Sequence, residues 1–122
     1  LADHPMHREW FELPADAATK INRARASGGR ICAVGTTAVR VLETCVRDGS
    51  VRGESGWTDI LIYPPYSFGA TDALLTNFHL PGSTLLALVF AFAGRETMLA
   101  AYRSAIEHGY RFYSYGDAML IV

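Results

Sequence analysis

Apolar residues recur along this chain with two spacings, and each spacing predicts one type of element. Where they repeat every three or four residues, they indicate helices packed on a core. Short continuous runs, such as residues 31–34, are typical of strands covered on both faces. The predicted helices cover residues 15–26, 36–48, 82–92 and 95–108, and the predicted strands cover residues 30–34, 58–63, 73–77, 110–115 and 118–122.

Strands and helices alternate along the chain, which indicates an α/β fold: a layered, mostly parallel sheet flanked by helices. The helix at 82–92 is apolar nearly all round and is expected to be buried, and the helix at 95–108 places Met98, Tyr102 and Ile106 on one side. The polar residues 52–56 are expected to form a mobile connection. A length of 122 residues predicts a single α/β domain over residues 1–122.

Charge and cysteine usage narrow the class of protein further. The formal net charge of −1 excludes a globally basic nucleic-acid-binding domain, so any RNA contact has to be local. Cys32 and Cys45 fit neither a disulfide framework nor a zinc spacing, which favours a reducing, cytoplasmic location. The longest apolar run, residues 85–93, is too short to span a bilayer, so we expect a soluble protein with no membrane partner.

Polar residues able to do chemistry lie between the predicted strand at 73–77 and the helix that follows it. Ligands of open α/β sheets bind at the carboxyl ends of strands. The exposed amides at the start of a helix favour an anion there. The alternative is that these hydroxyls and amides merely satisfy backbone groups in a turn. The polar residues of this stretch are Thr76, Asn77, His79, Ser83 and Thr84.

A second strand-to-helix turn holds Gly35, Thr36 and Thr37, followed one turn later by Arg40. Such a turn can bind an anion, although threonine at a helix start is also ordinary capping. Capping does not explain Arg40, which could pair with a carboxylate or phosphate at the helix start, or with Glu43 or another acid. This turn is therefore a second candidate for anion binding.

Two further groups of residues could carry chemistry. His4, His7 and Glu9 could bind a metal or move protons, but their spacing is not that of a zinc motif. Aromatic clusters at 63–68 and 110–115 could stack a base or belong to strands and the core. Asp117 after Gly116 fits a hairpin turn.

Taken together, these motifs resemble the C-terminal part of the S-adenosylmethionine:tRNA ribosyltransferase-isomerase family. Ala38 stands where the family usually has serine, so a hydroxyl there is not required. The family's N-terminal portion, with an inserted β-barrel domain, is missing here, so the isolated chain is expected to hold a partial site. The matching segments are Asp3-His4-Pro5-Met6-His7-Arg8-Glu9, Ala33 to Arg40, Ile62-Tyr63-Pro64, Asp72-Ala73-Leu74, Leu75 to Pro81, Ser83-Thr84-Leu85, Ala91 to Gly94, Tyr110-Arg111-Phe112 and Ser114 to Met119.

The resemblance implies a reaction of queuosine biosynthesis. The ribosyl part of S-adenosylmethionine is transferred to 7-aminomethyl-7-deazaguanine in tRNA and rearranged to an epoxycyclopentane, while adenine and methionine leave. S-adenosylmethionine is then a co-substrate, no cofactor is tightly bound and no metal is needed. This chemistry requires an acid or base, and groups that hold the methionine carboxylate.

The resemblance also assigns hypothetical roles to residues of this chain. His79 or His7 is the acid or base, and Asn77 and Asp117 hold purine or ribose hydroxyls. A tyrosine such as Tyr115 offers a stacking surface. The implied catalytic residues are His7, Glu9, His79 and Asp117, and the implied substrate-binding residues are Gly35, Thr36, Thr37, Arg40, Thr76, Asn77, Ser83 and Tyr115.

Two other functions compete with this interpretation. A non-catalytic RNA- or partner-binding domain would use the aromatic clusters and arginines but neither His79 nor Asn77. A metal-dependent hydrolase would be built on His4, His7 and Glu9, and would lose activity with a chelator.

Overall fold

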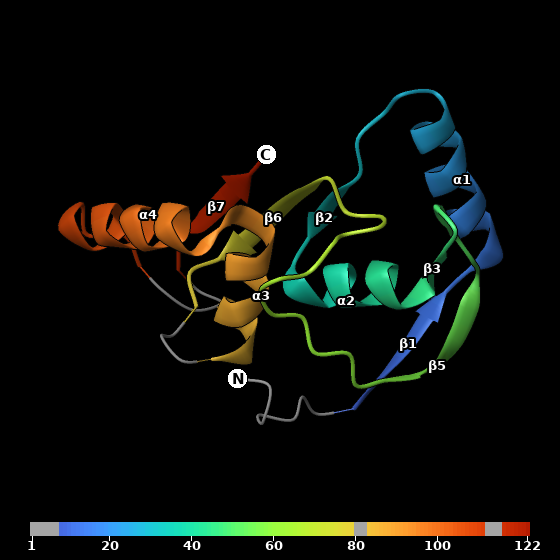
Figure 1. Cartoon of the computed structure of the whole chain (residues 1–122), viewed down its shortest axis with the longest axis horizontal. Helices are drawn as coiled ribbons and strands as arrows, with labels where there is room; N and C mark the ends of the chain where they lie inside the picture. The colour runs from blue at the N-terminus through green and yellow to red at the C-terminus, as the bar shows by residue number, and fades with distance from the viewer. Residues whose placement is uncertain (1–7, 80–82, 112–115) are drawn as a thin grey trace.

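The computed structural model describes residues 8–79, 83–111 and 116–122, which form four helices and seven strands. Figure 1 shows α2 in the middle of the molecule, with α1 at one end of the long axis and α4 at the other. The helices are α1 (Ala15–Ala26), α2 (Thr36–Cys45), α3 (Thr84–Ala93) and α4 (Arg95–Glu107). The strands are β1 (Glu9–Leu13), β2 (Cys32–Val34), β3 (Val46–Arg47), β4 (Ser50–Val51), β5 (Glu54–Thr58), β6 (Ala73–Asn77) and β7 (Ala118–Ile121).

The central sheet has the order β2-β6-β7. β2 and β6 are parallel, with Val34 beside Leu75, whereas β7 pairs antiparallel to β6, with Leu120 beside Leu75. The predicted α/β class is confirmed, but the sheet is mixed rather than mostly parallel. The strands β6 and β7 are separated by two consecutive helices, α3 and α4, instead of the single crossover helix that joins parallel neighbours.

One face of this sheet is not covered by the described residues. Ala33 and Leu74 are buried on the inner face, while Val34 and Leu120 are 69% and 59% exposed on the other. The expectation that residues 31–34 are covered on both faces is therefore wrong, and Cys32 is exposed. Cys45 is buried on α2, where burial and the nearby Glu54 carboxylate raise the pKa of its thiol to about 11, so it behaves as an apolar core residue.

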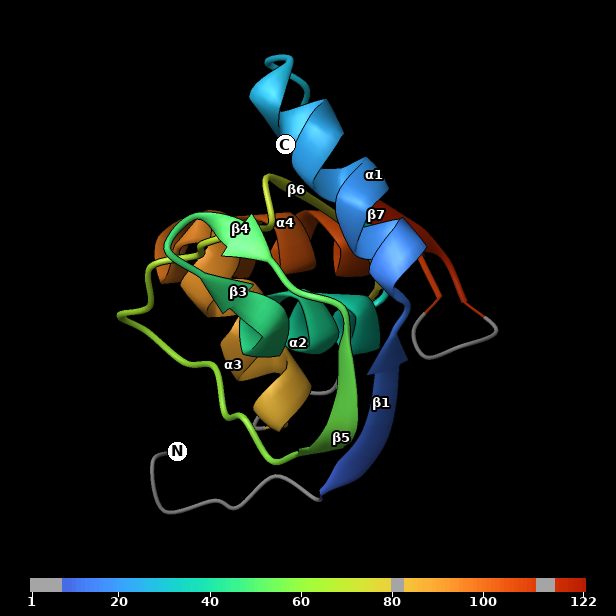
Figure 2. The ribbon, with the colours of Figure 1, turned by 90° about the vertical axis from the view of Figure 1, so that its right-hand side faces the viewer.

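A two-stranded antiparallel sheet of β1 and β5 lies against α2 (Figure 2). The sequence predicted no element at residues 9–13, which form β1. The predicted mobile connection at 52–56 and the predicted strand at 58–63 are wrong, because residues 54–58 form β5 and residues 59–63 are not a strand. The two segments alternate in burial, with Phe11 and Thr58 inward and the paired Trp10 and Trp57 outward. Glycine and glutamate in β5 hide this alternation from a hydrophobicity pattern.

The two helices predicted for this part of the chain are confirmed on either side of Gly94, and α3 and α4 pack against each other. The buried residues of α3 are Leu86, Ala87, Leu88 and Val89, and those of α4 are Met98, Tyr102 and Ala105. Ile106 is 66% exposed, so its predicted place on that side is wrong. The predicted strand at 110–115 is absent at 110 and 111, and residues 112–115 lie outside the described part of the chain.

No single helix of the described residues is long and apolar enough to cross a membrane. Helices α3 and α4 satisfy those two criteria only when they are taken together, across a bend of 114°.

A buried carboxylate organises the loop that leads into β6. Glu43 on α2 is 6% exposed and accepts hydrogen bonds from the backbone N–H groups of Gly69 at 2.7 Å, Ala70 at 3.0 Å and Thr71 at 3.1 Å. The Thr71 hydroxyl donates a fourth, at 3.0 Å. Burial, together with this carboxylate, raises the pKa of the nearby Tyr66 phenol to about 12. Glu43 thus fixes the chain immediately before the strand that carries the candidate site.

Candidate functional site at the carboxyl edge of β2 and β6

The two strand-to-helix turns predicted to bind a ligand lie side by side. The parallel pairing of β2 and β6 brings their carboxyl ends to one edge, where the Gly35 N–H donates to the Leu75 carbonyl at 2.8 Å. Thr76 and Asn77 are the last residues of β6 and His79 follows them, while Thr36 and Thr37 begin α2 directly after β2 and Gly35. Residues more than 40 positions apart therefore form one site, which we call the carboxyl-edge site.

Gly35 opens α2 in a backbone conformation that favours glycine. Its φ of +92° lies in a region that residues with a Cβ rarely adopt. Gly35 itself is the N-cap, so capping does not occupy the hydroxyls of Thr36 and Thr37, neither of which hydrogen-bonds to another described residue. The first amides of α2 and the exposed Thr37 hydroxyl are donors suited to an anionic group.

Arg40 is buried behind this edge, at 2% exposure. Its Nη1 donates to Glu9 Oε1 at 2.8 Å, and its Nε donates to the Ile60 carbonyl at 3.3 Å. One alternative from the sequence was that Arg40 pairs with a carboxylate, and that carboxylate belongs to Glu9 of β1. Glu43, the acid named as a possible partner, binds the 69–71 loop instead. The pair ties β1 to α2 beside the candidate site.

His79 has its imidazole and its backbone both fixed. Its Nε2 lies 3.0 Å from the Thr76 hydroxyl, and its backbone N–H donates to the Tyr102 phenol of α4 at 2.7 Å. Tyr102 is buried and stacks edge-on against Phe78, with ring centroids 5.3 Å apart. Burial lowers the pKa of His79 below its usual 6.5, so the imidazole is neutral at pH 7 and able to accept a proton.

We expect this burial to be visible as a pH dependence of stability. Because the pKa of His79 is lower in the folded chain, the unfolded chain binds more protons as the pH falls through 6.5, and the free energy of unfolding declines. Urea titrations between pH 5 and 8 would show the decline, and NMR would give a His79 midpoint below 6.5. His79→Gln should remove this contribution, whereas His108→Gln on the exposed end of α4 should not. A His79 midpoint above 6.5 would contradict the burial.

Asn77 and Asp117 complete this edge from β6 and β7. The Asn77 amide donates to the Asp117 carbonyl at 3.4 Å, next to the paired residues Asn77 and Ala118. The Asp117 carboxylate accepts from the Arg111 backbone N–H at 2.7 Å and lies 3.8 Å from its guanidinium. Asp117 therefore holds residues 111 and 117 together, as a turn residue would, while remaining 40% exposed.

Ser83 acts as the cap that one alternative predicted. Its Oγ accepts from the Leu86 N–H at 3.0 Å, which fixes the start of α3. His4, His7 and Tyr115 lie outside the described residues, so the metal alternative and the stacking role of Tyr115 are not placed. Within residues 8–79, 83–111 and 116–122, no group of three or more histidines, cysteines or carboxylates could hold a metal.

Two residues that shape the site were not among the sequence candidates. Glu43 lies four residues after Val39 on the apolar stripe of α2, and a charged residue at that position signals a buried, fully bonded carboxylate. Tyr102 was assigned only to the core of α4. Its bond to the His79 backbone depends on a contact between distant segments, and no local pattern indicates it.

Comparison with known proteins identifies the family. A family model described as queuosine biosynthesis protein matches residues 1–121. S-adenosylmethionine:tRNA ribosyltransferase-isomerases from Moorella thermoacetica and Heliobacterium modesticaldum are 60% and 57% identical to this chain over its whole length. The chain spans 36% of the length of each of these relatives.

A solved structure agrees with the fold. The S-adenosylmethionine tRNA ribosyltransferase of Thermotoga maritima superposes with a TM-score of 0.88 at 51% identity, covering 93% of this chain and 40% of that one. The ordered motifs, the layered α/β fold and the family match all agree. This chain belongs to the queuosine biosynthesis protein family.

Proposed function

We propose that this chain supplies part of the active site of a cytoplasmic S-adenosylmethionine:tRNA ribosyltransferase-isomerase. The ribosyl part of S-adenosylmethionine goes to 7-aminomethyl-7-deazaguanine in tRNA and is rearranged to the epoxycyclopentane of epoxyqueuosine. Adenine and methionine are released. The observation that carries the proposal is the carboxyl-edge site, where a neutral histidine, helix amides and hydroxyls converge in a member of this family.

Each residue of the site has a proposed role that follows from its chemistry. His79 moves a proton, with Thr76 setting the orientation of its ring. Gly35, Thr36 and Thr37 present donors to the methionine carboxylate. Asn77 and Asp117 hold ribose or purine groups, and Ser83 keeps α3 in register beside them.

The remaining candidates have supporting roles or lie outside the described part. Arg40 and Glu9 have a structural role and hold β1 against α2 beside the carboxyl-edge site, because the Arg40 guanidinium already donates to Glu9 and to the Ile60 carbonyl. His7 and Tyr115 stay candidates for proton transfer and stacking. S-adenosylmethionine is a co-substrate here, with no tightly bound cofactor.

The proposal is tested with a chimera, in which this chain replaces the matching 36% of the Moorella thermoacetica relative. The chimera and the isolated chain are incubated with S-adenosylmethionine and tRNA carrying the aminomethyl base, and adenine is measured by chromatography. We expect the chimera to release adenine at a rate within about tenfold of the relative, since contacts made in the transition state set the rate. A folded chimera that releases none, beside an active relative, contradicts the proposal.

The same experiment separates the alternatives. Release by the chimera alone means that the other 64% of the enzyme supplies essential groups. Binding of tRNA without adenine release by the folded chimera would favour an RNA-binding domain. Loss of adenine release on addition of a chelator would favour a metal-dependent enzyme.

A further inference from the structure

The cations of this chain are distributed unevenly. Although the formal net charge is −1, seven of the 11 Lys and Arg residues but only two of the 12 Asp and Glu residues lie between positions 17 and 53. Arg40 and Glu43 are buried and bonded within the fold, which leaves Asp48 as the one other acid between positions 17 and 53, against six other cations. Those cations are Lys20, Arg23, Arg25, Arg30, Arg47 and Arg52.

The fold brings the segments that carry two of them, Arg23 and Arg52, together where β4 packs on α1. The Asn22 side-chain amide donates to the Val51 carbonyl and its oxygen accepts from the Val51 N–H, each at 2.9 Å. These two hydrogen bonds hold α1 and β4 together. Arg23 follows Asn22 in the sequence and Arg52 follows Val51, so both cations lie beside this contact. At Gly53, an added Cβ would lie 2.6 Å from the Ala15 Cα, so the backbone here also touches α1.

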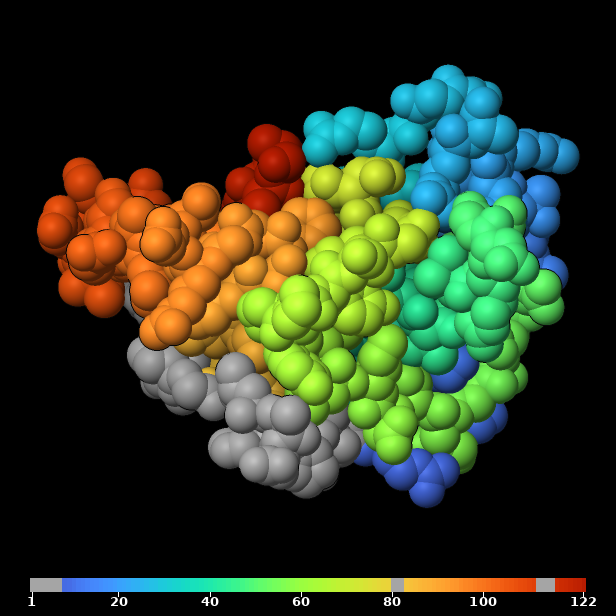
Figure 3. All heavy atoms as spheres, viewed as in Figure 1, coloured from blue at the N-terminus to red at the C-terminus, as the bar shows by residue number. Residues whose placement is uncertain are grey.

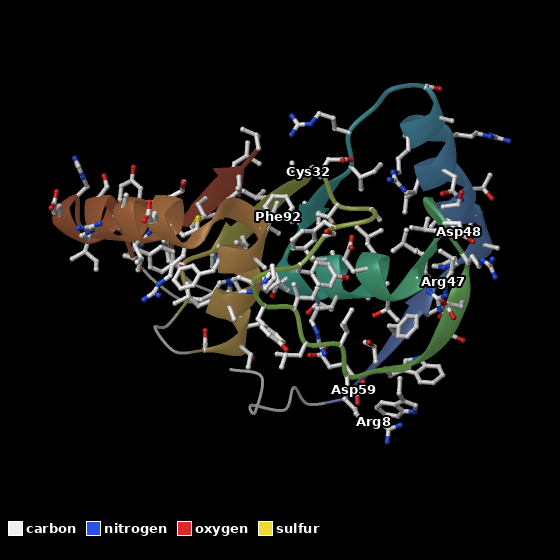
Figure 4. The ribbon with its side chains drawn as sticks, in the orientation of Figure 1. Arg8, Cys32, Arg47, Asp48, Asp59 and Phe92 are labelled. Atoms are coloured by element: carbon white, nitrogen blue, oxygen red, sulfur yellow. The ribbon has the colours of Figure 1, made fainter. Side chains whose placement is uncertain are left out.

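Lys20 extends this group along α1, because residues three apart in a helix are neighbours on its surface. We call Lys20, Arg23 and Arg52 the α1–β4 cation cluster. Figure 3 shows α1 and the β3–β4 hairpin adjoining on the molecular surface, at the end away from α4. Figure 4 marks Arg47 and Asp48 of the hairpin at the same end.

The three cations of the cluster have no bonding partner within the described part of the chain. All are exposed, and no side chain of the cluster forms an ion pair or hydrogen bond with another described residue. Asp16, one turn before Lys20, makes no ion pair with it among these residues. The neighbouring arginines differ: Arg25 donates to the Gly49 and Gly69 carbonyls, and Arg47 lies 3.7 Å from Glu54.

Uncompensated cations on one surface attract a polyanion and raise its rate of association. We propose that the α1–β4 cation cluster binds the sugar–phosphate backbone of the substrate tRNA, beside the stem that presents the modified base to the carboxyl-edge site. Contacts of this kind position a nucleic acid and carry no sequence information. The inference rests on the proposed function for the identity of the RNA, and it supplies the local RNA contact that a net charge of −1 requires.

The test compares two double variants of this chain with equal net charge: Arg23→Gln/Arg52→Gln in the cluster and Arg95→Gln/Arg103→Gln on α4. Binding of tRNA is followed by fluorescence anisotropy between 0.05 and 0.3 M salt. Removing two phosphate contacts should weaken binding roughly ten- to a hundredfold at 0.1 M salt and lower the slope of log Kd against log salt by about two. The α4 variant should bind as the wild-type chain does.

Three results would overturn the proposal. One is equal weakening by both double variants, since net charge alone would then explain it. Another is an unchanged salt slope in the cluster variant. The third is tighter binding of a polyglutamate peptide than of tRNA, which would assign the cluster to an acidic protein. Adenine release is not measured, so an inactive chimera would contradict the proposed function and leave this result standing.

Discussion

Replacing Glu43 by glutamine is expected to lower the free energy of unfolding by about 3 kcal/mol. The two carboxylate oxygens accept three backbone N–H groups and the Thr71 hydroxyl, all within 3.1 Å, in a site that is 6% exposed. The glutamine amide keeps the shape of the side chain but turns one acceptor into a donor. That donor then faces backbone N–H groups, which are left buried without a partner.

Urea unfolding followed by tryptophan fluorescence would measure the change. Glu107→Gln is the matched control, because it makes the same chemical replacement on the exposed end of α4 and should alter stability by less than about 0.5 kcal/mol. The loop that Glu43 holds leads directly into β6, so crystals of the variant should show residues 69–71 displaced. Equal stability of the two variants would mean that the loop does not depend on the carboxylate.

The helices were predictable from the sequence because their signals are local. The apolar stripe of α2, the fully apolar α3 and the glycine between α3 and α4 indicate their elements within about ten residues. The β1–β5 pair could not be predicted from the sequence, because Glu9 pairs with Thr58 almost fifty residues away and β5 contains Gly56. Its stability comes from packing on α2 rather than from a pattern within either strand.

Some features of the candidate site could likewise be predicted from the sequence and others could not. The convergence of the two strand-to-helix turns follows from one rule, that parallel strands end at a common edge. The polar pairs follow from tertiary contacts: Arg40 meets Glu9 of β1, and Tyr102 accepts from the His79 backbone. The candidate site residues were therefore visible in the sequence, whereas the residues that hold them in place were not.

Replacing His79 by glutamine in the chimera is expected to slow adenine release about a hundredfold or more, the usual loss when a general acid or base is removed. Glutamine can still hydrogen-bond to the Thr76 hydroxyl, but it cannot exchange a proton near neutral pH. The histidine is suited to the role because burial lowers its pKa and keeps it neutral at pH 7. It therefore serves as a base without first losing a proton to water.

A pH profile distinguishes proton transfer from mere positioning. If His79 moves a proton, the acid limb of log kcat against pH reports its lowered pKa and is absent in His79→Gln. Tyr102→Phe removes the hydroxyl that accepts from the His79 backbone N–H, so it should lower the rate but keep the acid limb. His108→Gln on the exposed end of α4 controls for loss of an imidazole. Turnover near normal in His79→Gln would remove His79 from the mechanism, and the proton would then have to pass through another group, for which His7 is the remaining imidazole candidate.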